Sequence, residues 1–565
     1  FYGTIHGAGS FFDPNSLTRN NTLISPYADP EYKPETFYYT DAINDHAAKF
    51  ISEHKGDRPF FLYVAHTAPH WPMHALPEDM AKYKGRYDKG WEVMREARYK
   101  RQLEMGLIDK KWKLSPRDGT AWKDAPNQKW EIRLMETYAA MVDRLDQGIG
   151  RVIGALEKRK MLDDTLILFL ADNGGCAEGM GRRQGIQYKD KDPDQLKPMK
   201  ATDLQIDMIP KRTREGVVLK QGTDVMTGGA DTYHGYGLSW ANASNTPFRQ
   251  YKHWVHEGGI SSPLVAHWPK GIEEKLNGKM DSQPAHLIDL MATCADLGKA
   301  TYPEQVKEQD IVPLQGVSIA AAFTGKKIDR KNPIFWEHEG NRAIRIGKWK
   351  LVAKGSKGPW ELYDLEEDRT ELNDLSEKHE HRAKEMAVLW EAWALEAKAK
   401  PWPWGGNAKK KGSKKKTFNL KEKDLLDMEN APMIANKAFE VEAQYQGEGD
   451  GVLVAQGGDA HGWVLYLEDD RLHFGVCRHG KFSVVKATSP LESKMRKGLV
   501  QLLKNGEVKF FDGKQVIGEG KLAGLVSEMP IDGLQVGRDE GGTVGLYKDA
   551  FPFPGEVKKL RIKIN

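Results

Sequence analysis

The 565-residue sequence contains only three cysteines, at positions 176, 294 and 477, and they are far apart. This spacing excludes a disulfide framework and a thiolate zinc site. No apolar stretch approaches the roughly 20 residues that a transmembrane helix needs. The 84 basic residues are nearly balanced by 80 acidic ones, so there is no general signature of polyanion binding. We therefore expect neither a membrane span nor a nucleic-acid partner.

The N-terminal residues, Phe1 to Ser10, contain no initiator methionine and no basic segment followed by an apolar core and a cleavage site. A signal peptide is therefore not visible. The chain starts in the middle of a pattern, and we interpret it as a fragment that begins downstream of the natural N-terminus.

Two short apolar runs predict strands that are buried on both faces, over residues 58–66 and 165–171. An amphipathic helix is predicted over 131–160, directly before the second run, and a third strand-like run follows at 258–269. This order is typical of an α/β domain with a mostly parallel sheet and flanking helices. Sites in such sheets lie at the carboxyl ends of the strands. The first run ends near His66 and His70, and the second ends at Asp172 and Asn173.

The sequence pattern after the predicted α/β domain changes twice, first to alternating strands with a helix and then, after a Lys-rich segment, to many short strands. Residues 334–365 alternate around a glycine and predict an antiparallel hairpin, which a charged helix over 379–399 follows. Six lysines between 409 and 416 favour a solvated linker over an anion-binding patch. Short alternating segments with Gly-Asp and Asn-Gly turns then predict an all-β sandwich. We expect an α/β domain over 1–330, a small α+β subdomain with antiparallel strands over 331–400, a Lys-rich linker over 401–436 and the sandwich over 437–565.

Several motifs occur in a fixed order over about residues 1–400. They are Pro59-Phe-Phe-Leu-Tyr-Val-Ala-His-Thr-Ala-Pro-His70-Trp-Pro, Tyr83-Lys-Gly-Arg-Tyr-Asp-Lys-Gly-Trp91, Tyr138-Ala-Ala-Met-Val-Asp-Arg-Leu-Asp, Ala171-Asp-Asn-Gly-Gly175, Asn245-Thr-Pro-Phe-Arg249, Tyr251-Lys-His-Trp-Val-His-Glu-Gly-Gly259 and Trp360-Glu-Leu-Tyr-Asp-Leu365. Together they resemble the bacterial arylsulfatase branch of the type I sulfatases. The resemblance implies an alkaline-phosphatase-like fold and hydrolysis of sulfate esters. The C-terminal part resembles a concanavalin-like or laminin-G-like domain.

Asp172 and Asn173 offer a carboxylate and an amide oxygen, which are hard donors suited to calcium. Taken alone, Asp-Asn-Gly-Gly favours a simple turn. The resemblance implies instead that both residues are ligands of a divalent cation, which we expect to be Ca²⁺. The family's other protein ligands precede Phe1.

His70 lies between Pro69 and Trp71-Pro72, where it could equally pack on the indole. The resemblance implies that His70 contacts the sulfate and protonates the leaving oxygen, a task that suits a near-neutral pKa. Lys252 would be a surface lysine on local grounds, whereas the resemblance implies that it binds a sulfate oxygen. The family usually has glycine on both sides of this lysine, but Tyr251 and His253 stand there in this sequence.

Type I sulfatases use a Cys or Ser that lies two residues before a Pro and four before an Arg and is oxidised to formylglycine. None of the three cysteines has that context, and Ser282-Gln-Pro-Ala-His286 lacks the Arg. We therefore expect the nucleophile to lie upstream of Phe1 and this chain to be inactive alone.

The resemblance also bears on substrate and location. It implies a sulfate-ester small molecule or a sulfated glycan as substrate, and a periplasmic or secreted protein. Two alternatives stay open: a phosphodiesterase or phosphonate monoester hydrolase of the same superfamily, and a non-catalytic protein that binds sulfated glycans.

Overall fold

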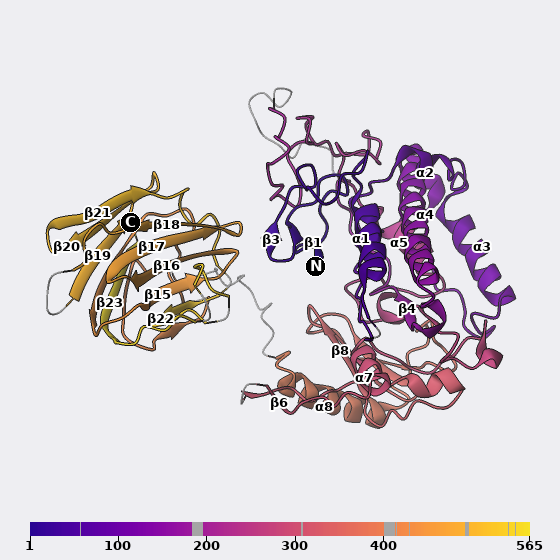
Figure 1. Cartoon of the computed structure of the whole chain (residues 1–565). Coiled ribbons are helices and arrows are strands. Elements are labelled where there is room, and N and C mark those ends of the chain that lie inside the picture. The colour runs from indigo at the N-terminus through magenta and orange to yellow at the C-terminus, as the bar shows by residue number, and fades with distance from the viewer. Residues whose placement is uncertain are drawn as a thin grey trace. The chain divides into compact units, whose positions relative to one another are not determined.

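The computed structural model describes the chain except residues 57, 183–195, 307–308, 401–412, 414, 429, 492–495, 531, 541, 548–549 and 565. By its contacts the chain divides into two compact units (Figure 1). One comprises Phe1–Asn20 and Ile24–Pro403, and the other comprises Asn21–Leu23 and Trp404–Asn565.

Helices and short sheets make up the first unit. Its helices are α1 (Tyr39–Glu53), α2 (Pro77–Ala81), α3 (Gly90–Glu104), α4 (Gln128–Lys158), α5 (Gly237–Ser244), α6 (Glu257–Ile260), α7 (Ile288–Leu297) and α8 (Glu380–Glu396). Its strands are β1 (Tyr2–Thr4), β2 (Leu17–Arg19), β4 (Ile167–Leu170), β5 (Leu264–His267), β6 (Gln305–Val306), β7 (Gln309–Asp310), β8 (Ile334–His338), β9 (Asn341–Ile346), β10 (Trp349–Ala353) and β11 (Glu361–Asp364). The short strand β3 (Thr22–Leu23) is grouped with the second unit.

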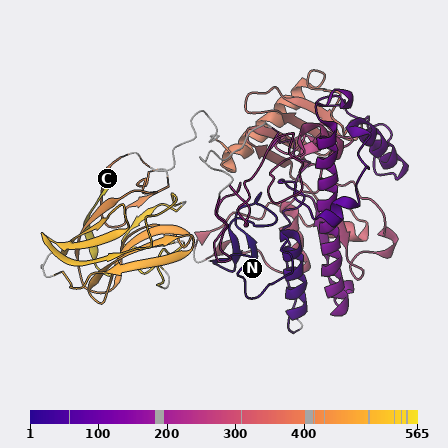
Figure 2. The same cartoon turned by 90° about the horizontal axis from the view of Figure 1, so that it is seen from above.

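The helix predicted over 131–160 is confirmed as α4, which lies beside α1 (Figure 2). The Asn127 side chain caps it by accepting the N–H of Trp130 at 3.2 Å. Trp130 and Leu134 are fully buried on its apolar face. On the polar side Arg144 donates two hydrogen bonds to Asp41 of α1, at 2.6 and 2.9 Å to the same carboxylate oxygen. An apolar seam and an ion pair therefore join the two helices.

The chain combines helices and sheets, as the α/β class requires, but the structure corrects the expectation of a mostly parallel sheet. The strands β4 and β5, which lie in the predicted runs 165–171 and 258–269, pair antiparallel. The run 58–66 forms no strand, since no strand in the described part of the chain pairs with it. Its Phe61 and Tyr63 are each 80% exposed. An apolar pattern predicts a buried strand only where other elements cover both of its faces.

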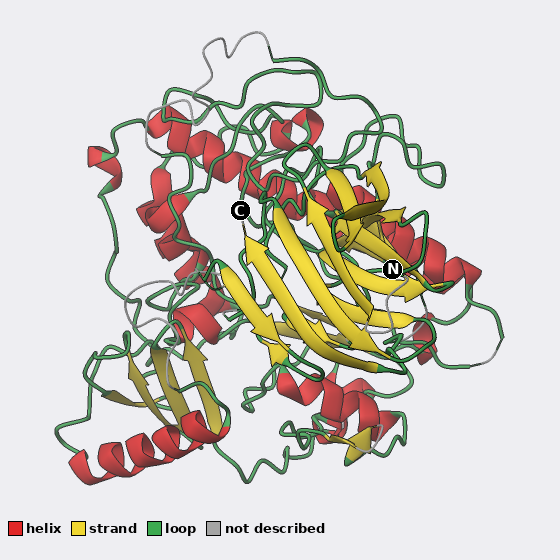
Figure 3. Ribbon diagram, turned by 90° about the vertical axis from the view of Figure 1, so that its left-hand side faces the viewer, coloured by secondary structure: helices red, strands yellow, loops and turns green. Residues whose placement is uncertain are grey.

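A four-stranded antiparallel sheet with the order β11-β10-β9-β8 follows, and it contains the hairpin predicted in 334–365. The helix α8 lies along one face of this sheet (Figure 3). Between them Ile344, Leu351, Leu362 and Trp390 form a fully buried core.

The second unit is an all-β sandwich of two six-stranded sheets (Figure 3). The sheet orders are β12-β23-β14-β19-β20-β21 and β13-β22-β15-β16-β17-β18. The strands are β12 (Thr417–Leu420), β13 (Leu425–Leu426), β14 (Phe439–Gln446), β15 (Gly451–Gly457), β16 (His461–Glu468), β17 (Arg471–Arg478), β18 (Lys481–Lys486), β19 (Arg496–Leu502), β20 (Glu507–Asp512), β21 (Gln515–Lys521), β22 (Leu534–Val536) and β23 (Glu556–Ile564). Trp463 and Phe474 are fully buried in its core.

The boundary predicted between linker and sandwich needs a second correction. Within the stretch 401–436, β12 pairs with β23 and β13 pairs with β22, so residues from Thr417 onward belong to the sheets. Phe418 is buried between the sheets and anchors β12, a signal that the neighbouring lysine run obscured. Residues 401–412, with part of that run, lie outside the described residues. Among the described helices, none is both long and apolar enough to cross a membrane.

Candidate functional site

The segment after β4 lies directly against the segment that begins at Tyr251. The N–H of Gly174 donates to the carbonyl of Gly259 at 2.9 Å, and the N–H of Lys252 donates to the carbonyl of Gly175 at 3.1 Å. A Cβ on Gly174 would lie 1.8 Å from the carbonyl oxygen of Gly258, so no other residue fits without moving the backbone. The glycines of the Asp-Asn-Gly-Gly motif thus bring two of the predicted site segments together.

His70 and Lys252 are in direct contact: Lys252 Nζ lies 3.0 Å from His70 Nε2. His70 Nδ1 lies 2.8 Å from the carbonyl oxygen of Trp71, and because a carbonyl only accepts, Nδ1 carries the hydrogen. Nε2 of the neutral ring then accepts a hydrogen from the lysine. Burial lowers the pKa of His70, and the charge of Lys252 lowers it further, while the bond to Trp71 acts in the opposite direction. The ring is therefore a neutral imidazole with a fixed orientation.

The two neighbouring histidines have other partners. His74 is fully buried, with Nε2 2.7 Å from the carbonyl of Thr232. His66 Nε2 lies 2.9 Å from Asn44 Oδ1, and burial lowers the pKa of His66 to about 4. Of the three, His70 is the one placed against Lys252.

Asp172 and Asn173 follow β4, with Asp172 exposed and Asn173 half-buried. Asn173 donates its amide hydrogen to the carbonyl of Gly174 at 2.9 Å, which turns its Oδ1 away from the backbone. Calcium takes six to eight oxygen ligands, so the two residues fit such an ion as part of its shell and leave most positions to other donors.

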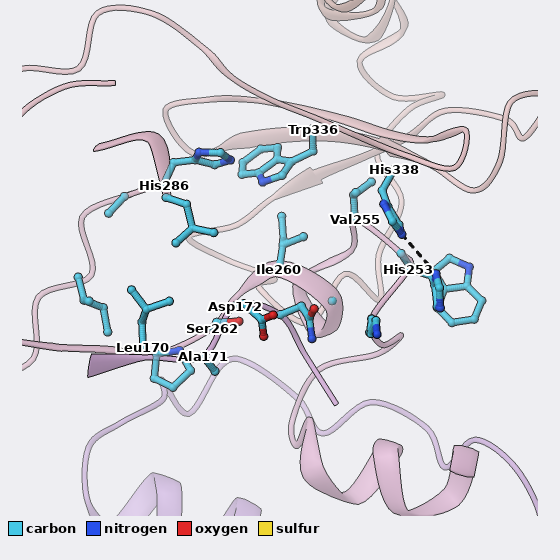
Figure 4. Close-up of a pocket in the computed structure, with 18 of the residues that line it drawn as sticks. Leu170, Ala171, Asp172, His253, Val255, Ile260, Ser262, His286, Trp336 and His338 are labelled. Carbon is cyan, nitrogen blue, oxygen red and sulfur yellow. Dashed lines mark hydrogen bonds between the residues drawn. The ribbon is translucent and has the colours of Figure 1, made fainter. Parts of the chain in front are cut away.

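Asp172, Asn173 and Lys252 line one cavity of about 330 Å³. Figure 4 shows this cavity, whose other walls are largely apolar. On one wall the rings of His286 and Trp336 lie 5.6 Å apart between centroids. His70 does not line the cavity but contacts Lys252, which does. The cavity thus offers one cationic group and two oxygen donors for metal within walls suited to an organic group.

Glu178 is a site residue that the sequence did not single out. Its carboxylate accepts hydrogen bonds from Trp71 Nε1 at 2.6 Å, His253 Nε2 at 3.0 Å and Cys176 Sγ at 3.1 Å. Burial alone would raise the pKa of Glu178, but these donors outweigh it and lower the pKa to about 2. The ionised carboxylate therefore links Trp71, which follows His70, to His253, which follows Lys252.

His253 has φ +84°, a backbone conformation that favours glycine. This explains why a glycine is expected after the lysine. A histidine in this conformation is strained, and it persists here because its ring is held on both sides, at Nε2 by Glu178 and at Nδ1 by Glu339 (3.1 Å). The departure from the family pattern was the one signal in the sequence that pointed to this residue.

A buried ion network anchors the other end of the Lys252 segment. Glu257, the first residue of α6, accepts a hydrogen bond from Lys350 Nζ at 2.8 Å and another from Arg369 at 3.1 Å. Lys350 also lies 2.9 Å from Glu371 Oε1, without hydrogen-bond geometry. Burial opposes ionisation of Glu257, but the two cations prevail and lower its pKa. Glu257 thus holds the start of α6 to the strand and the loop that carry these cations.

Comparison with known families gives two matches that overlap along the first unit. The profile of the family described as sulfatase matches residues 2–300. A second profile, described as N-sulphoglucosamine sulphohydrolase, C-terminal, matches residues 248–395.

Among curated proteins, an uncharacterized sulfatase of Schizosaccharomyces pombe is 29% identical over 416 residues, which cover 70% of this chain and 70% of that protein. The arylsulfatase of Klebsiella aerogenes is 26% identical over 311 residues, 53% of this chain and 59% of the relative. A sulfatase of Formosa agariphila is 25% identical over 403 residues, 66% of this chain and 53% of the relative. The chain thus spans less than two thirds of the length of the last two. The crystal structure of Ps i-CgsB is 24% identical with a TM-score of 0.40, and it covers 68% of this chain and 59% of its own.

Proposed function

The chain belongs to the sulfatase family, whose profile matches more than half of its residues, and we propose from this premise that it supplies one half of an active site that hydrolyses sulfate esters. The observation that carries the proposal is the 3.0 Å contact between His70 and Lys252, beside two oxygen donors that open into the same cavity as the lysine. We also propose that the enzyme is of the arylsulfatase type. The chain would then consist of a sulfatase domain, an α+β subdomain and a concanavalin- or laminin-G-like sandwich.

Each residue of this half-site has a distinct task. Lys252 binds a non-bridging sulfate oxygen and stabilises the charge that develops as the ester bond breaks. Asp172 and Asn173 would hold a divalent cation, which we take to be Ca²⁺, and a cation there polarises the sulfate as a Lewis acid.

His70 delivers a proton from Nε2 to the leaving ester oxygen, because the bond to Trp71 aims this atom towards Lys252 and its bound anion. The sulfate anion opposes the effect of the lysine charge, so substrate binding raises the proton affinity of the imidazole. His70 is therefore neutral in the free site and gains its proton with the substrate.

The nucleophile is proposed to be a formylglycine in a segment that precedes Phe1. The three cysteines do not suit the role, because none of them lies two residues before a Pro and four before an Arg. The exposed face of Phe61 and Tyr63 supports the proposal, because further strands would cover it. The chain alone is then expected to be inactive.

The test compares two proteins with nitrophenyl sulfate as substrate: the chain 1–565, and a longer chain that includes the segment encoded upstream. We expect turnover only in the longer chain, with a dependence on divalent cations. His70→Ala and Lys252→Ala in the longer chain should each lower kcat/KM by 100-fold or more, on the order of the loss of one charge-stabilising or acid group. Lys270→Ala, at an exposed lysine, is the matched control.

Two outcomes would refute this assignment. Turnover by the chain 1–565 would show that the nucleophile lies within it, and wild-type rates in both site variants would show that the half-site is elsewhere. A nitrophenyl phosphonate or phosphodiester cleaved faster than the sulfate would favour the phosphoryl alternative. Binding of a sulfated glycan without turnover by the longer chain would favour the non-catalytic one. The proposed substrate is a sulfate-ester small molecule or a sulfated glycan. The proposed location of the protein is periplasmic or secreted.

A further inference from the structure

Beside the Lys252 segment, three potential metal ligands converge on one point. His253 Nδ1 lies 3.1 Å from Glu339 Oε2 and 3.3 Å from His338 Nε2, and the third side of this triangle, His338 Nε2 to Glu339 Oε2, measures 4.0 Å. A tetrahedral zinc ion with ligands at ~2.0 Å holds them about 3.3 Å apart. Two sides of the triangle match this separation, and the third is about 0.7 Å longer, so a small movement of the exposed His338 or Glu339 side chain completes the geometry. Figure 4 shows the two imidazoles facing each other.

Glu178 orients the first of these ligands. His253 Nε2 lies 3.0 Å from Glu178 Oε1, so the other ring nitrogen, Nδ1, faces Glu339 and His338. A metal ion between the three donor atoms would therefore meet His253 at Nδ1.

The ligands are held in place before any ion arrives. The strand β8 ends at His338, and Glu339 and Gly340, both with positive φ (51° and 85°), form the tight turn to β9, which starts at Asn341. The Asn341 amide donates to the carbonyl of His253 at 2.7 Å and to the carbonyl of His338 at 3.0 Å. One buried side chain thus links the backbones of the two histidines.

We propose that His253, His338 and Glu339 form a second metal site, which binds a divalent transition metal of the zinc class through two imidazole nitrogens and one carboxylate oxygen. Glu178 orients His253 through the ring nitrogen that does not bind the metal, an arrangement that fixes the tautomer of metal-bound histidines. The two imidazole nitrogens distinguish this second site from the all-oxygen pair Asp172 and Asn173.

The site has a place for a further ligand. His253 and His338 both line the 330 Å³ cavity, so the fourth position of a tetrahedral ion is available to water or to an anionic group on a molecule bound there. The metal also ties the strained residue after Lys252 to the β8–β9 turn. It thereby links the proposed sulfate-binding lysine to the sheet.

The test uses the untagged chain 1–565, stripped of metal with a chelator and titrated with Co²⁺ alone. We expect one equivalent to give the intense visible absorption of tetrahedral Co²⁺, which Zn²⁺ then displaces. His338→Ala and Glu339→Gln should abolish this signal. His253→Gly should do the same without disturbing the backbone, because glycine suits its φ. Glu178→Gln should weaken zinc binding by about 10- to 100-fold.

The control variant is His461→Ala. His461, His479 and Glu528 form the other such group in the described part of the chain, and it lies in the sandwich. The proposal is overturned if no metal binds tightly, as a protonated His253 bridging two carboxylates would predict. It is also overturned if binding survives in the His253 and His338 variants or is lost only with His461→Ala. Metal binding by this chain needs no nucleophile, so it stands or falls independently of sulfatase activity.

Discussion

Replacing Lys350 with methionine tests the ion network that holds the segment carrying Lys252. Lys350 lies in β10 and is fully buried, with Glu257 2.8 Å away and Glu371 2.9 Å away. Both carboxylates are themselves buried. Methionine keeps the apolar stem but removes the charge, so Glu257 would keep its ion pair with Arg369 while the buried Glu371 would lose its ion pair with Lys350.

The loss of one partner from a buried ion pair costs about 3–5 kcal/mol, because the charge left behind stays desolvated. We expect a loss of this size in the free energy of unfolding of the first unit, out of a total on the order of 5–15 kcal/mol. Adding Glu371→Gln to Lys350→Met should restore part of it, since the double variant leaves only one carboxylate to neutralise.

Urea denaturation followed by tryptophan fluorescence measures this loss, because most of the tryptophans lie in the first unit. Hydrogen exchange in β9 to β11 then locates it. Lys384→Met, which breaks an exposed pair with Glu380, is the control and should leave the midpoint almost unchanged. If Lys350→Met unfolded within about 1 kcal/mol of the wild type, the buried network would not stabilise this unit and the reasoning would fail.

Two further substitutions test other parts of the structure. Gly174→Ala places a methyl group against the carbonyl of Gly258 and should lower the free energy of unfolding by about 1–3 kcal/mol. Gly154→Ala, in an open position of α4, should raise it by about 0.5–1 kcal/mol. Urea denaturation measures both changes. An equal effect of the two would contradict the close packing described for the Gly174 segment. Burial raises the pKa of Asp539 to about 6, so the stability contributed by its protonated form is present below about pH 4 and lost as the pH rises through 6. The stability of Asp539→Asn relative to the wild type should therefore rise by about 1–3 kcal/mol between pH 4 and pH 7. Hydrogen exchange of the sandwich measures this difference, and a difference that did not change with pH would refute the prediction.

Local periodicity correctly predicted those elements whose buried and exposed faces can be identified from their own residues. The amphipathic spacing in 131–160 predicted α4, because one face of a helix can be buried by its neighbours wherever they lie. Alternation predicted the sandwich strands, since the side chains of a strand point alternately to its two faces. The apolar run at 58–66 failed because a strand also needs partners for its backbone, and these are not encoded in the run itself.

The family resemblance named His70, Lys252, Asp172 and Asn173, and their roles stay predictions. Glu178 and Glu339 had no such signal, because a carboxylate in a loop is ordinary until its neighbours are known. His253 had a partial signal, as a non-glycine at a glycine position.

By itself the sequence determined the sulfatase family, the order of the motifs, the α4 helix and the presence of a β-sandwich, because these depend on residue identity and local periodicity. Only the tertiary structure decided that His70 and Lys252, 182 residues apart, lie within 3.0 Å of each other, and that His253, His338 and Glu339 form a triangle of metal-binding size. The reason is that such convergence depends on packing between distant segments, here on glycines close enough for backbone contact and on one asparagine that links two loops. The periodicity of residues along the chain does not predict those contacts.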